Sequence, residues 1–182
     1  MIRKILLQCK FFIVAFLNCS YYIVPGSLLS RLYLSLFLIK VGRRSKIHRG
    51  VRFFHIGKLK VGNNSTINFG CYLDNRRGIY IGNNVGIAHD TKIYTLGHDI
   101  EDPTFKTKGA PVYIKDNSFI FANCLIMPGI TIGEGSIILP GSVVTKNIPP
   151  FTIWGGNPAK QIKERKNHDI KYTQYYPYLF AL

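Results

Sequence analysis

The feature that most restricts the fold of this chain is a repeat of six residues. From residue 41 to residue 144 an apolar residue opens each group of six, and a small or β-branched residue often stands four positions later. An α-helix cannot use this period, because 3.6 residues per turn would spread the apolar positions around its surface. A short strand followed by a tight corner can use it, and three such groups close one triangular coil. The repeat therefore predicts a mainly β protein, built as a parallel β-helix with its apolar residues stacked inside.

The repeat also shows where the coil departs from regularity. Val41, Val61 and Ile81 are 20 residues apart, whereas Ile114 and Ile132 are 18 apart. Each early coil therefore carries two extra residues, which we expect at one corner, near residues 57–60 and 78–80. The openings are Val41, Ile47, Phe53, Val61, Ile67, Leu73, Ile81, Ile87, Ile93, Ile114, Ile120, Ile126, Ile132, Ile138 and Val144. Other corners are rich in Asn and Gly, which tolerate positive φ: Gly62-Asn63-Asn64, Gly82-Asn83-Asn84, Asp116-Asn117 and Gly133-Glu134-Gly135.

The pattern breaks once, between Ile93 and Ile114. Residues 95–111 must leave the coil there as an inserted loop, and a loop of that length in a compact repeat is usually functional. The sequence thus divides into an N-terminal helical segment (residues 1–40), a β-helix (41–155), and a C-terminal helix and tail (156–182).

The N-terminal segment has several possible roles. Arg3, Lys4 and Lys10 are followed by an apolar run over residues 11–24, which is interrupted by polar residues and is too short to span a membrane. A signal peptide would need a small-residue cleavage site, and none follows the run. Two alternatives remain open: an amphipathic helix on an anionic membrane surface, or a helix packed on the main domain or on a neighbouring subunit. A second helix is expected over residues 27–39, after Pro25-Gly26.

Charge and cysteine content exclude some classes of function. With 24 basic and 9 acidic residues the formal charge is +15, which favours anionic partners. Nucleic acid is not expected among them, because the chain has no basic run with interleaved aromatic residues. The four cysteines show no C-x-x-C spacing, so no metal site is expected from them. Cys71 and Cys124 occupy repeat positions where neighbouring coils have Ser, Thr or Val, which predicts small, buried, reduced side chains.

Three stretches resemble a known family, the hexapeptide-repeat transferases, and most closely the sugar and capsule O-acetyltransferases of the galactoside and maltose acetyltransferase type. They are IYTLGHDIEDPTF (residues 93–105), IMPGITIGEGSIILPGSVVTKNIPP (126–150) and IWGGNPAKQIKER (153–165). The resemblance runs from about residue 41 to residue 165. It implies a left-handed β-helix, a homotrimer, and transfer of acetyl from acetyl-coenzyme A to a sugar or glycan hydroxyl.

His98 is the catalytic residue that the resemblance implies. A sugar hydroxyl is a poor nucleophile, and a base that removes its proton assists attack on a thioester. An imidazole titrates near neutral pH and suits this role. His98 lies at the start of the inserted loop, after Gly97 and near three acids, and in the resembled family the histidine of this motif is the general base. We expect His48 and His55 to be structural and His168 to be solvated.

The acceptor site follows by the same resemblance from INFGCYLDN, residues 67–75. Asn68 and Asp74 match the family's asparagine and acidic residue best, and a one-residue gap makes Asn75 an alternative to Asp74. Asn68 is equally well explained as a corner residue. Arg77 stands where a small residue is usual, which indicates either a bulge or a role with an anionic acceptor. His89 is a further candidate for this site.

The donor, acetyl-coenzyme A, is expected along the later coils, where basic side chains can hold its phosphates. The positions that match the family are Ala122, Pro140, Thr145 and Lys160, with Lys146 as a further phosphate ligand. Some relatives have a tryptophan and a serine where this chain has Phe119 and Ala122. The missing serine hydroxyl leaves stabilisation of the oxyanion to backbone amides.

Other functions of the same fold differ from O-acetylation in the residues that they require. N-acetylation of an amino sugar uses the same fold, and a non-catalytic β-helical scaffold would need neither the His98 loop nor the closing G-N-P-A-K. A zinc hydratase of the same fold would need three convergent histidines, and His89 and His98 lack a third at the expected spacing. We expect a cytoplasmic protein that can lie on the inner face of the cell membrane.

Overall fold

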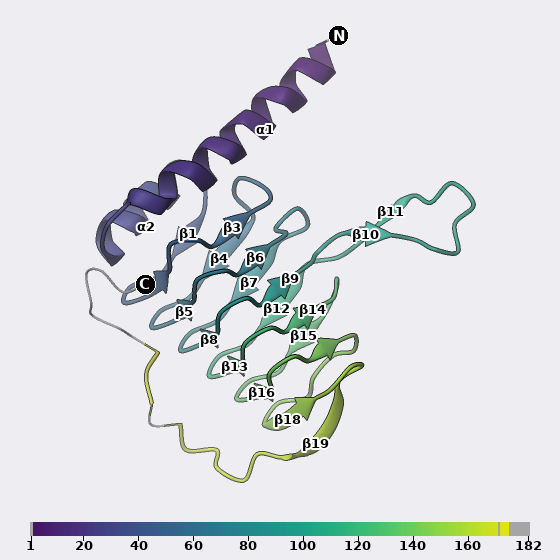
Figure 1. Ribbon diagram of the computed structural model, residues 1–182. Helices are drawn as coiled ribbons and strands as arrows, with labels where there is room; N and C mark the ends of the chain where they lie inside the picture. The colour runs from purple at the N-terminus through teal and green to yellow at the C-terminus, as the bar shows by residue number, and fades with distance from the viewer. Residues whose placement is uncertain (1, 171, 175–182) are drawn as a thin grey trace.

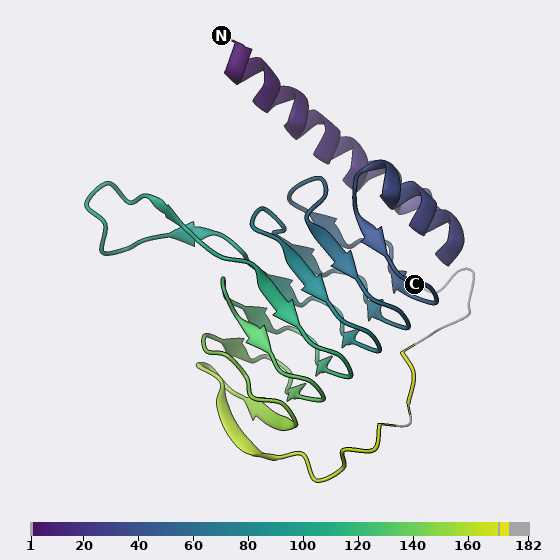
Figure 2. The same cartoon turned by 180° about the vertical axis from the view of Figure 1, so that it is seen from behind.

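The computed structural model describes residues 2–170 and 172–174, and shows a triangular β-helix capped at its N-terminal end by two helices (Figures 1 and 2). The caps are α1 (Ile2–Ser20), the short 3-10 helix η1 (Tyr21–Ile23) and α2 (Ser27–Leu36). Sheet A has the order β1-β4-β7-β12-β15, formed by Lys40–Val41, Leu59–Val61, Ile79–Ile81, Val112–Ile114 and Thr131–Ile132. Sheet C has the order β17-β14-β9-β6-β3, formed by Val143–Val144, Leu125–Ile126, Lys92–Ile93, Tyr72–Leu73 and Arg52–Phe53.

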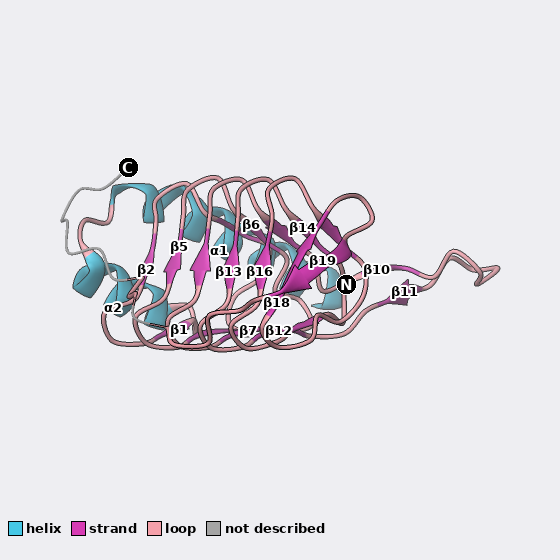
Figure 3. Ribbon diagram, turned by 90° about the horizontal axis from the view of Figure 1, so that it is seen from below, coloured by secondary structure: helices cyan, strands magenta, loops and turns pink. Residues whose placement is uncertain are grey.

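Sheet B forms the third face and continues to the C-terminal end of the coil. Its order is β19-β18-β16-β13-β8-β5-β2, formed by Lys160–Glu164, Thr152–Gly155, Ile137–Ile138, Phe119–Ile120, Gly86–Ile87, Thr66–Ile67 and Lys46–Ile47. Strands within each sheet pair in parallel, except for the final pair β18-β19. Figure 3 shows the coil from the side, with the strands of sheet B next to one another in successive coils.

The six-residue repeat builds the core as predicted. Each opening residue ends a strand and points inward, and its partner in the next coil is another opening residue, as in the pairs Val41–Val61 and Ile114–Ile132. Fourteen of the fifteen openings are buried, and Val41, in the first coil, is half-buried. The predicted parallel β-helix of hexapeptide repeats is therefore confirmed.

Where a Ser or Cys stands four positions after an opening, its side chain has a hydrogen-bonding role. Ser45 donates its hydroxyl to the carbonyl of Gly62 (2.6 Å), and Ser65 donates to the carbonyl of Gly82 (2.8 Å). Cys71 makes the same contact with the carbonyl of Ala88 (3.2 Å). Each side chain thus satisfies a corner carbonyl of the next coil that the sheets leave unpaired. Cys71 and Cys124 are buried and unpaired, as the repeat predicted.

The corners follow the sequence prediction as well. Asn64, Asn84 and Asn117 have φ between +53° and +59°, in the left-handed region that asparagine tolerates better than most residues. The extra residues of the early coils lie between sheets C and A, where Gly57 and Gly78 also have positive φ.

The helices supply hydrogen bonds that a preceding coil would otherwise provide. The Asn18 amide of α1 donates to the carbonyl of Phe53 (2.8 Å) and accepts from its N–H (2.8 Å), so it pairs with the open edge of β3. The Tyr21 hydroxyl donates to the carbonyl of Ile47 (2.6 Å) in β2. Leu17, Tyr21 and Leu34 are buried and close the end of the core. The sequence left two alternatives for this segment. The second half of α1 follows one of them, because it packs on the main domain.

The C-terminal prediction was wrong in one respect. Residues 156–170 and 172–174 contain no helix, and Lys160–Glu164 instead forms β19, antiparallel to β18. The chain then runs back along sheet B (Figure 1), where Gln174 is buried and its N–H donates to the side-chain oxygen of Asn84 (3.1 Å). The rest of the predicted tail, residues 175–182, lies outside the described residues.

The amide of Asn18 can be tested by mutation. Asn18→Ala leaves the N–H and carbonyl of Phe53 without these partners, and should lower the free energy of unfolding by about 1–3 kcal/mol in urea denaturation. Cys19→Ala, an exposed neighbour on the same helix, is the matched control and should change little. Equal effects of the two substitutions would contradict the capping role.

Thiol reactivity tests the placement of the four cysteines. Burial raises the pKa of Cys71 to about 12 and also raises the pKa of Cys124, and the thiolate is the reactive form. At pH 8 a disulfide reagent should therefore react quickly with exposed Cys9 and Cys19, and with the two core cysteines only after unfolding. Fast reaction of more than two thiols in the folded protein would contradict this packing.

Candidate active site

The interruption of the repeat forms an arm that projects from the corner between sheets C and A (Figures 1 and 2). Its two sides are β10 (Gly97–His98) and β11 (Thr107–Lys108), paired antiparallel with His98 opposite Thr107. At the base, Gly109 lies so close to the other side that a Cβ would fall 2.2 Å from the carbonyl oxygen of Thr95. The arm leaves the coil without disturbing it, because Ile81 and Ile114 still pair in neighbouring strands.

His98 is exposed on this arm, and its ring stacks on Phe105 with centroids 4.7 Å apart and planes 7° apart. The nearby acids predicted from sequence have other partners. Asp99 pairs with Lys108 (3.0 Å), and Asp102 pairs with Lys106. Both lysines hold the pKa of their carboxyl partner below its usual range, that of Asp102 at about 2. These pairs connect the two sides of the arm, while the ring of His98 stacks on Phe105 and remains exposed.

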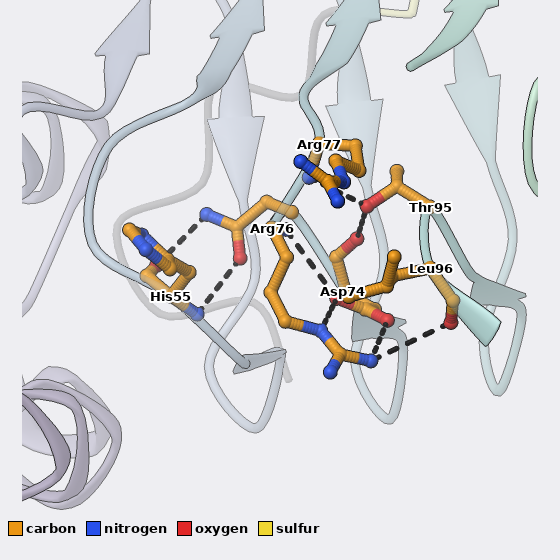
Figure 4. A network of polar contacts seen from close by, with 7 residues as sticks. His55, Asp74, Arg76, Arg77, Thr95 and Leu96 are labelled. Carbon is orange, nitrogen blue, oxygen red and sulfur yellow. Dashed lines mark hydrogen bonds and ion pairs between the residues drawn. The ribbon is translucent and has the colours of Figure 1, made fainter. Parts of the chain in front are cut away.

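The arm is tied to the coil by a polar network at its base (Figure 4). The Asp74 carboxylate is almost fully buried, and Arg76 donates to it through Nε (2.8 Å) and a terminal nitrogen (2.7 Å). The same terminal nitrogen lies 3.5 Å from the carbonyl of Leu96 in the arm. The Thr95 hydroxyl donates to the backbone carbonyl of Asp74 (2.6 Å). The bidentate pair with Asp74 raises the pKa of Arg76. The Arg76 guanidinium also lies over the ring of Phe54, 4.3 Å from its centroid.

The structure separates the acceptor candidates that sequence left open. Asn75 is fully buried, and its amide pairs with the backbone of the preceding coil at His55 and Gly57 (2.6–2.9 Å), so it has no free group for an acceptor. Arg77 has an exposed side chain, and its backbone N–H donates to the Thr95 hydroxyl (2.9 Å). Arg77 thus lies in the bulge of an enlarged corner. A bulge was one of the two interpretations of Arg77 from the sequence, the other being a role with an anionic acceptor.

The remaining candidates lie on a second ridge, at the corner between sheets B and C. Asn68 follows β5, and its N–H donates to the carbonyl of Ile87. His89 follows β8, is exposed, and stacks on Phe69 with centroids 5.3 Å apart and planes 7° apart. Half-buried Ala122 and exposed Pro140 continue this ridge in the later coils. Within one chain, Asn68 and His89 are therefore on the other side of sheet C from Asp74 and the arm.

The basic donor candidates are at the C-terminal end of the coil. Thr145 and Lys146 are exposed directly after β17, and exposed Lys160 begins β19. The segment before Lys160 is held against β17, because Val143 donates its N–H to the carbonyl of Gly156 (3.0 Å) and accepts from the N–H of Ala159 (2.8 Å).

Comparisons with known proteins agree with this architecture. Residues 111–146 match the family model described as bacterial transferase hexapeptide (six repeats). A solved structure of a maltose O-acetyltransferase from Clostridium difficile 630 is 31% identical, with a TM-score of 0.79 and 89% of each chain covered. The chain belongs to the hexapeptide-repeat transferases.

Two further relatives define the branch of hexapeptide-repeat transferases to which this chain is similar. The galactoside O-acetyltransferase of Escherichia coli K12 is 32% identical over 72% of this chain. A solved galactoside acetyltransferase in complex with coenzyme A is 25% identical, with a TM-score of 0.78, 89% of this chain covered and 86% of that chain. The matched region spans 54% to 66% of the first curated relatives.

Two features of this hexapeptide-repeat site were not found from sequence. Arg76, rather than Arg77, forms the ion pair with buried Asp74, and Phe105 stacks on the ring of His98. The Asp-x-Arg spacing was a visible signal for the first, whereas the fold of the arm was needed for the second. Within residues 2–170 and 172–174, no group of three His, Cys, Asp or Glu side chains could hold a metal ion.

Breaking the Asp74–Arg76 pair tests the base of the arm. Arg76→Met leaves a buried carboxylate without its cation and should lower the free energy of unfolding by about 2–3 kcal/mol. Arg77→Met, in the adjacent exposed position, is the control and should stay within about 0.5 kcal/mol. Adding Asp74→Asn to Arg76→Met should recover about 1 kcal/mol or more in a double-mutant cycle. Additive losses would show that the pair contributes nothing as a pair.

Proposed function

We propose that this protein is an acetyl-coenzyme A-dependent O-acetyltransferase that acts on a sugar or glycan hydroxyl, with His98 as general base. The observation that carries the proposal is the exposed imidazole, stacked on Phe105, on a paired arm of a hexapeptide-repeat coil. Relatives at 31–32% identity are named galactoside and maltose O-acetyltransferases, which supports a hydroxyl acceptor. N-acetylation of an amino sugar has no comparable support from these relatives.

The proposed reaction transfers an acetyl group directly, without an acyl-enzyme. The acceptor hydroxyl attacks the thioester carbonyl as His98 removes the hydroxyl proton. The tetrahedral intermediate then collapses, the C–S bond breaks, and the imidazolium returns a proton to the leaving thiolate. The products are an acetyl ester and the free thiol of coenzyme A. Because Asp99 and Asp102 are paired with lysines, the stack on Phe105 is what orients the imidazole within the chain.

The donor is proposed to lie along the later coils toward Lys160. The extended arm of coenzyme A carries amides that can pair with exposed backbone, and its phosphates require cations. Lys146 and Lys160 are exposed at this end of the coil, and Thr145 adds a hydroxyl. Ala122 and Pro140 present small, unobstructed surface along the ridge. The coenzyme A complex of a galactoside acetyltransferase with the same fold supports this donor.

We further propose that a homotrimer completes the site. Asn68 and His89 lie on one ridge and Asp74 and the arm on another, so one chain does not bring all the acceptor candidates together. An arm that projects away from its own coil can reach the second ridge of a neighbouring copy. A buried Asp74 acts in this arrangement by positioning the base of the arm, while Asn68, His89 and Arg77 are accessible to an acceptor. We place the enzyme in the cytoplasm, where acetyl-coenzyme A and reduced thiols are available.

Calorimetric titration with acetyl-coenzyme A, followed by an assay of released thiol, tests the proposal. His98→Ala should keep donor binding and lower turnover about a hundredfold to ten-thousandfold, because only proton transfer is lost. Lys160→Ala should weaken donor binding about tenfold by removing a charge-assisted contact with a phosphate. Acceptors should include galactosides, maltose and an amino sugar, so that ester and amide products can be distinguished.

Two substitutions serve as controls. His168→Ala removes a histidine from the tail, and Lys60→Ala removes an exposed lysine from β4, far from the C-terminal end of the coil. Neither should change donor binding or turnover. Absence of acetyl-coenzyme A binding in a folded sample would overturn the proposed function and favour a scaffold. Amide formation in place of ester formation would correct the acceptor class.

A further inference from the structure

The N-terminal cap exposes more large apolar side chains than any other part of the described chain. In α1, Phe12 is 73% exposed and Leu6 is 64% exposed, and Ile23 in η1 is 79% exposed. The first half of α1 extends beyond the coil without packing on it (Figures 1 and 2). A helix that is apolar on nearly all sides is normally covered by protein or lipid. Exposed large apolar residues of the cap are Ile5, Leu6, Leu7, Phe11, Phe12, Ile13, Phe16, Tyr22, Ile23, Leu28, Leu29, Leu32, Leu36 and Leu38.

Helix α2 continues this apolar surface with one defined stripe. Leu28, Leu32 and Leu36 are four residues apart, so they lie on one face of the helix. All three are more than half exposed, while Leu34 on the opposite side is buried in the core.

A cationic pocket adjoins the leucine stripe. It has a volume of about 380 Å³ and is lined by Arg31, Leu32, Ser35, Leu38, Ile39, Lys40 and Val41. Arg31 Nε is buried and has no hydrogen-bond partner among the described residues. Arg31 itself is half-exposed, and because a buried N–H normally finds an acceptor, its side chain fits an anion bound from outside the described residues. Two cations beside exposed leucines fit a phosphate that is joined to hydrocarbon.

The charge of the chain is distributed unevenly along its length. Residues 1–73 contain 12 of the 24 basic residues and none of the 9 acidic residues, the first of which is Asp74. Every acid therefore lies in the later part of the chain, and the cap with its first coils carries only positive charge. Such a surface is attracted to the anionic lipids of a cytoplasmic membrane leaflet.

We infer that the cap formed by α1, η1 and α2 docks on an anionic phospholipid membrane. The leucine stripe and the free half of α1 enter the interface between headgroups and acyl chains. Arg31 and Lys40 bind a lipid phosphate in their pocket, and the other cations of the first coils approach the charged surface. This inference does not rest on the proposed reaction, because it uses residues on the far end of the coil from Lys160.

The same geometry favours docking on the membrane surface over spanning it. Residues 3–23 are long and apolar enough to cross a membrane by length and composition alone. However, Val14, Leu17 and Tyr21 are buried, and Asn18 pairs with β3, so the second half of α1 belongs to the coil. Spanning would require the coil to lose its cap.

Docking would also orient the candidate active site. The free half of α1 and the arm that carries His98 project toward the same side of the coil in both views (Figures 1 and 2). A membrane held by the cap therefore brings the arm near acceptors that are themselves attached to lipid.

Sedimentation of the full-length chain with vesicles tests the inference. Vesicles of phosphatidylcholine containing phosphatidylglycerol should bind the protein, and vesicles of phosphatidylcholine alone should bind it more weakly. Leu32→Asp should lower the partition coefficient at least about tenfold, because a charge replaces an inserted side chain. Arg31→Gln with Lys40→Gln should lower it about fivefold for each charge, and added salt should reduce that difference.

Matched controls separate a membrane surface from other occupants. Ile162→Asp, at a site 56% exposed against 58% for Leu32, lies at the other end of the coil and should leave vesicle binding intact. Thermal unfolding of Leu32→Asp should match that of the parent protein. If Leu32→Asp instead changes the sedimentation coefficient without lipid, the face is a contact between copies and the inference is wrong. It is also wrong if inorganic phosphate stabilises the protein while vesicles fail to bind, or if membrane-bound protein resists alkaline extraction as a spanning helix would.

Discussion

The stacking of coils in register is the constraint on which the rest of this structure depends. Each coil offers backbone N–H and carbonyl groups along its upper and lower edges, and these are satisfied only by another coil or by a substitute. The inward-facing residue that opens each repeat keeps the coils in register. Ile81 and Ile114, for example, remain paired in neighbouring strands although the arm is inserted between them in the sequence. At the first coil the substitute is Asn18, whose side-chain amide pairs with Phe53 as a strand would. At the last coil it is the returning strand β19.

This constraint explains why the repeat was readable from the sequence and the ends were not. Every inward position must be apolar and every corner must turn tightly, so the period of six appears in the residues themselves. The ends have no repeating partner and take whatever local solution the chain offers. Lys160–Glu164 contains one apolar residue, Ile162, among polar and charged residues that are compatible with a helix, but β18 presents an open edge, and pairing with it decides the conformation. Only the folded coil shows that edge.

The candidate site was predictable to the same uneven degree. His98 was identified from its motif and lies on the arm, and its role as general base stays a proposal. Sequence matched Asp74 best, but it left Asn75 as an alternative and Arg77 with two interpretations, because the direction of a side chain at a corner is set by the fold. The fold directs the Asn75 amide into the preceding coil and the Asp74 carboxylate toward Arg76. The stack of His98 on Phe105 depends on the path of the arm, which no local pattern of the sequence encodes.

The N-terminal cap leaves apolar side chains exposed and one buried donor without an acceptor among the described residues. Core formation requires only that Leu17, Tyr21 and Leu34 cover the first coil, and it gives no reason for leucines on the opposite face of α2. Exposed leucines cost solubility in a soluble protein and are not needed for the cap. On the same helix, the buried Nε–H of Arg31 has no acceptor among the described residues, which is a cost to folding unless a bound partner supplies one. An apolar surface beside a cation with an unpartnered donor therefore fits a single partner, one that carries both hydrocarbon and phosphate.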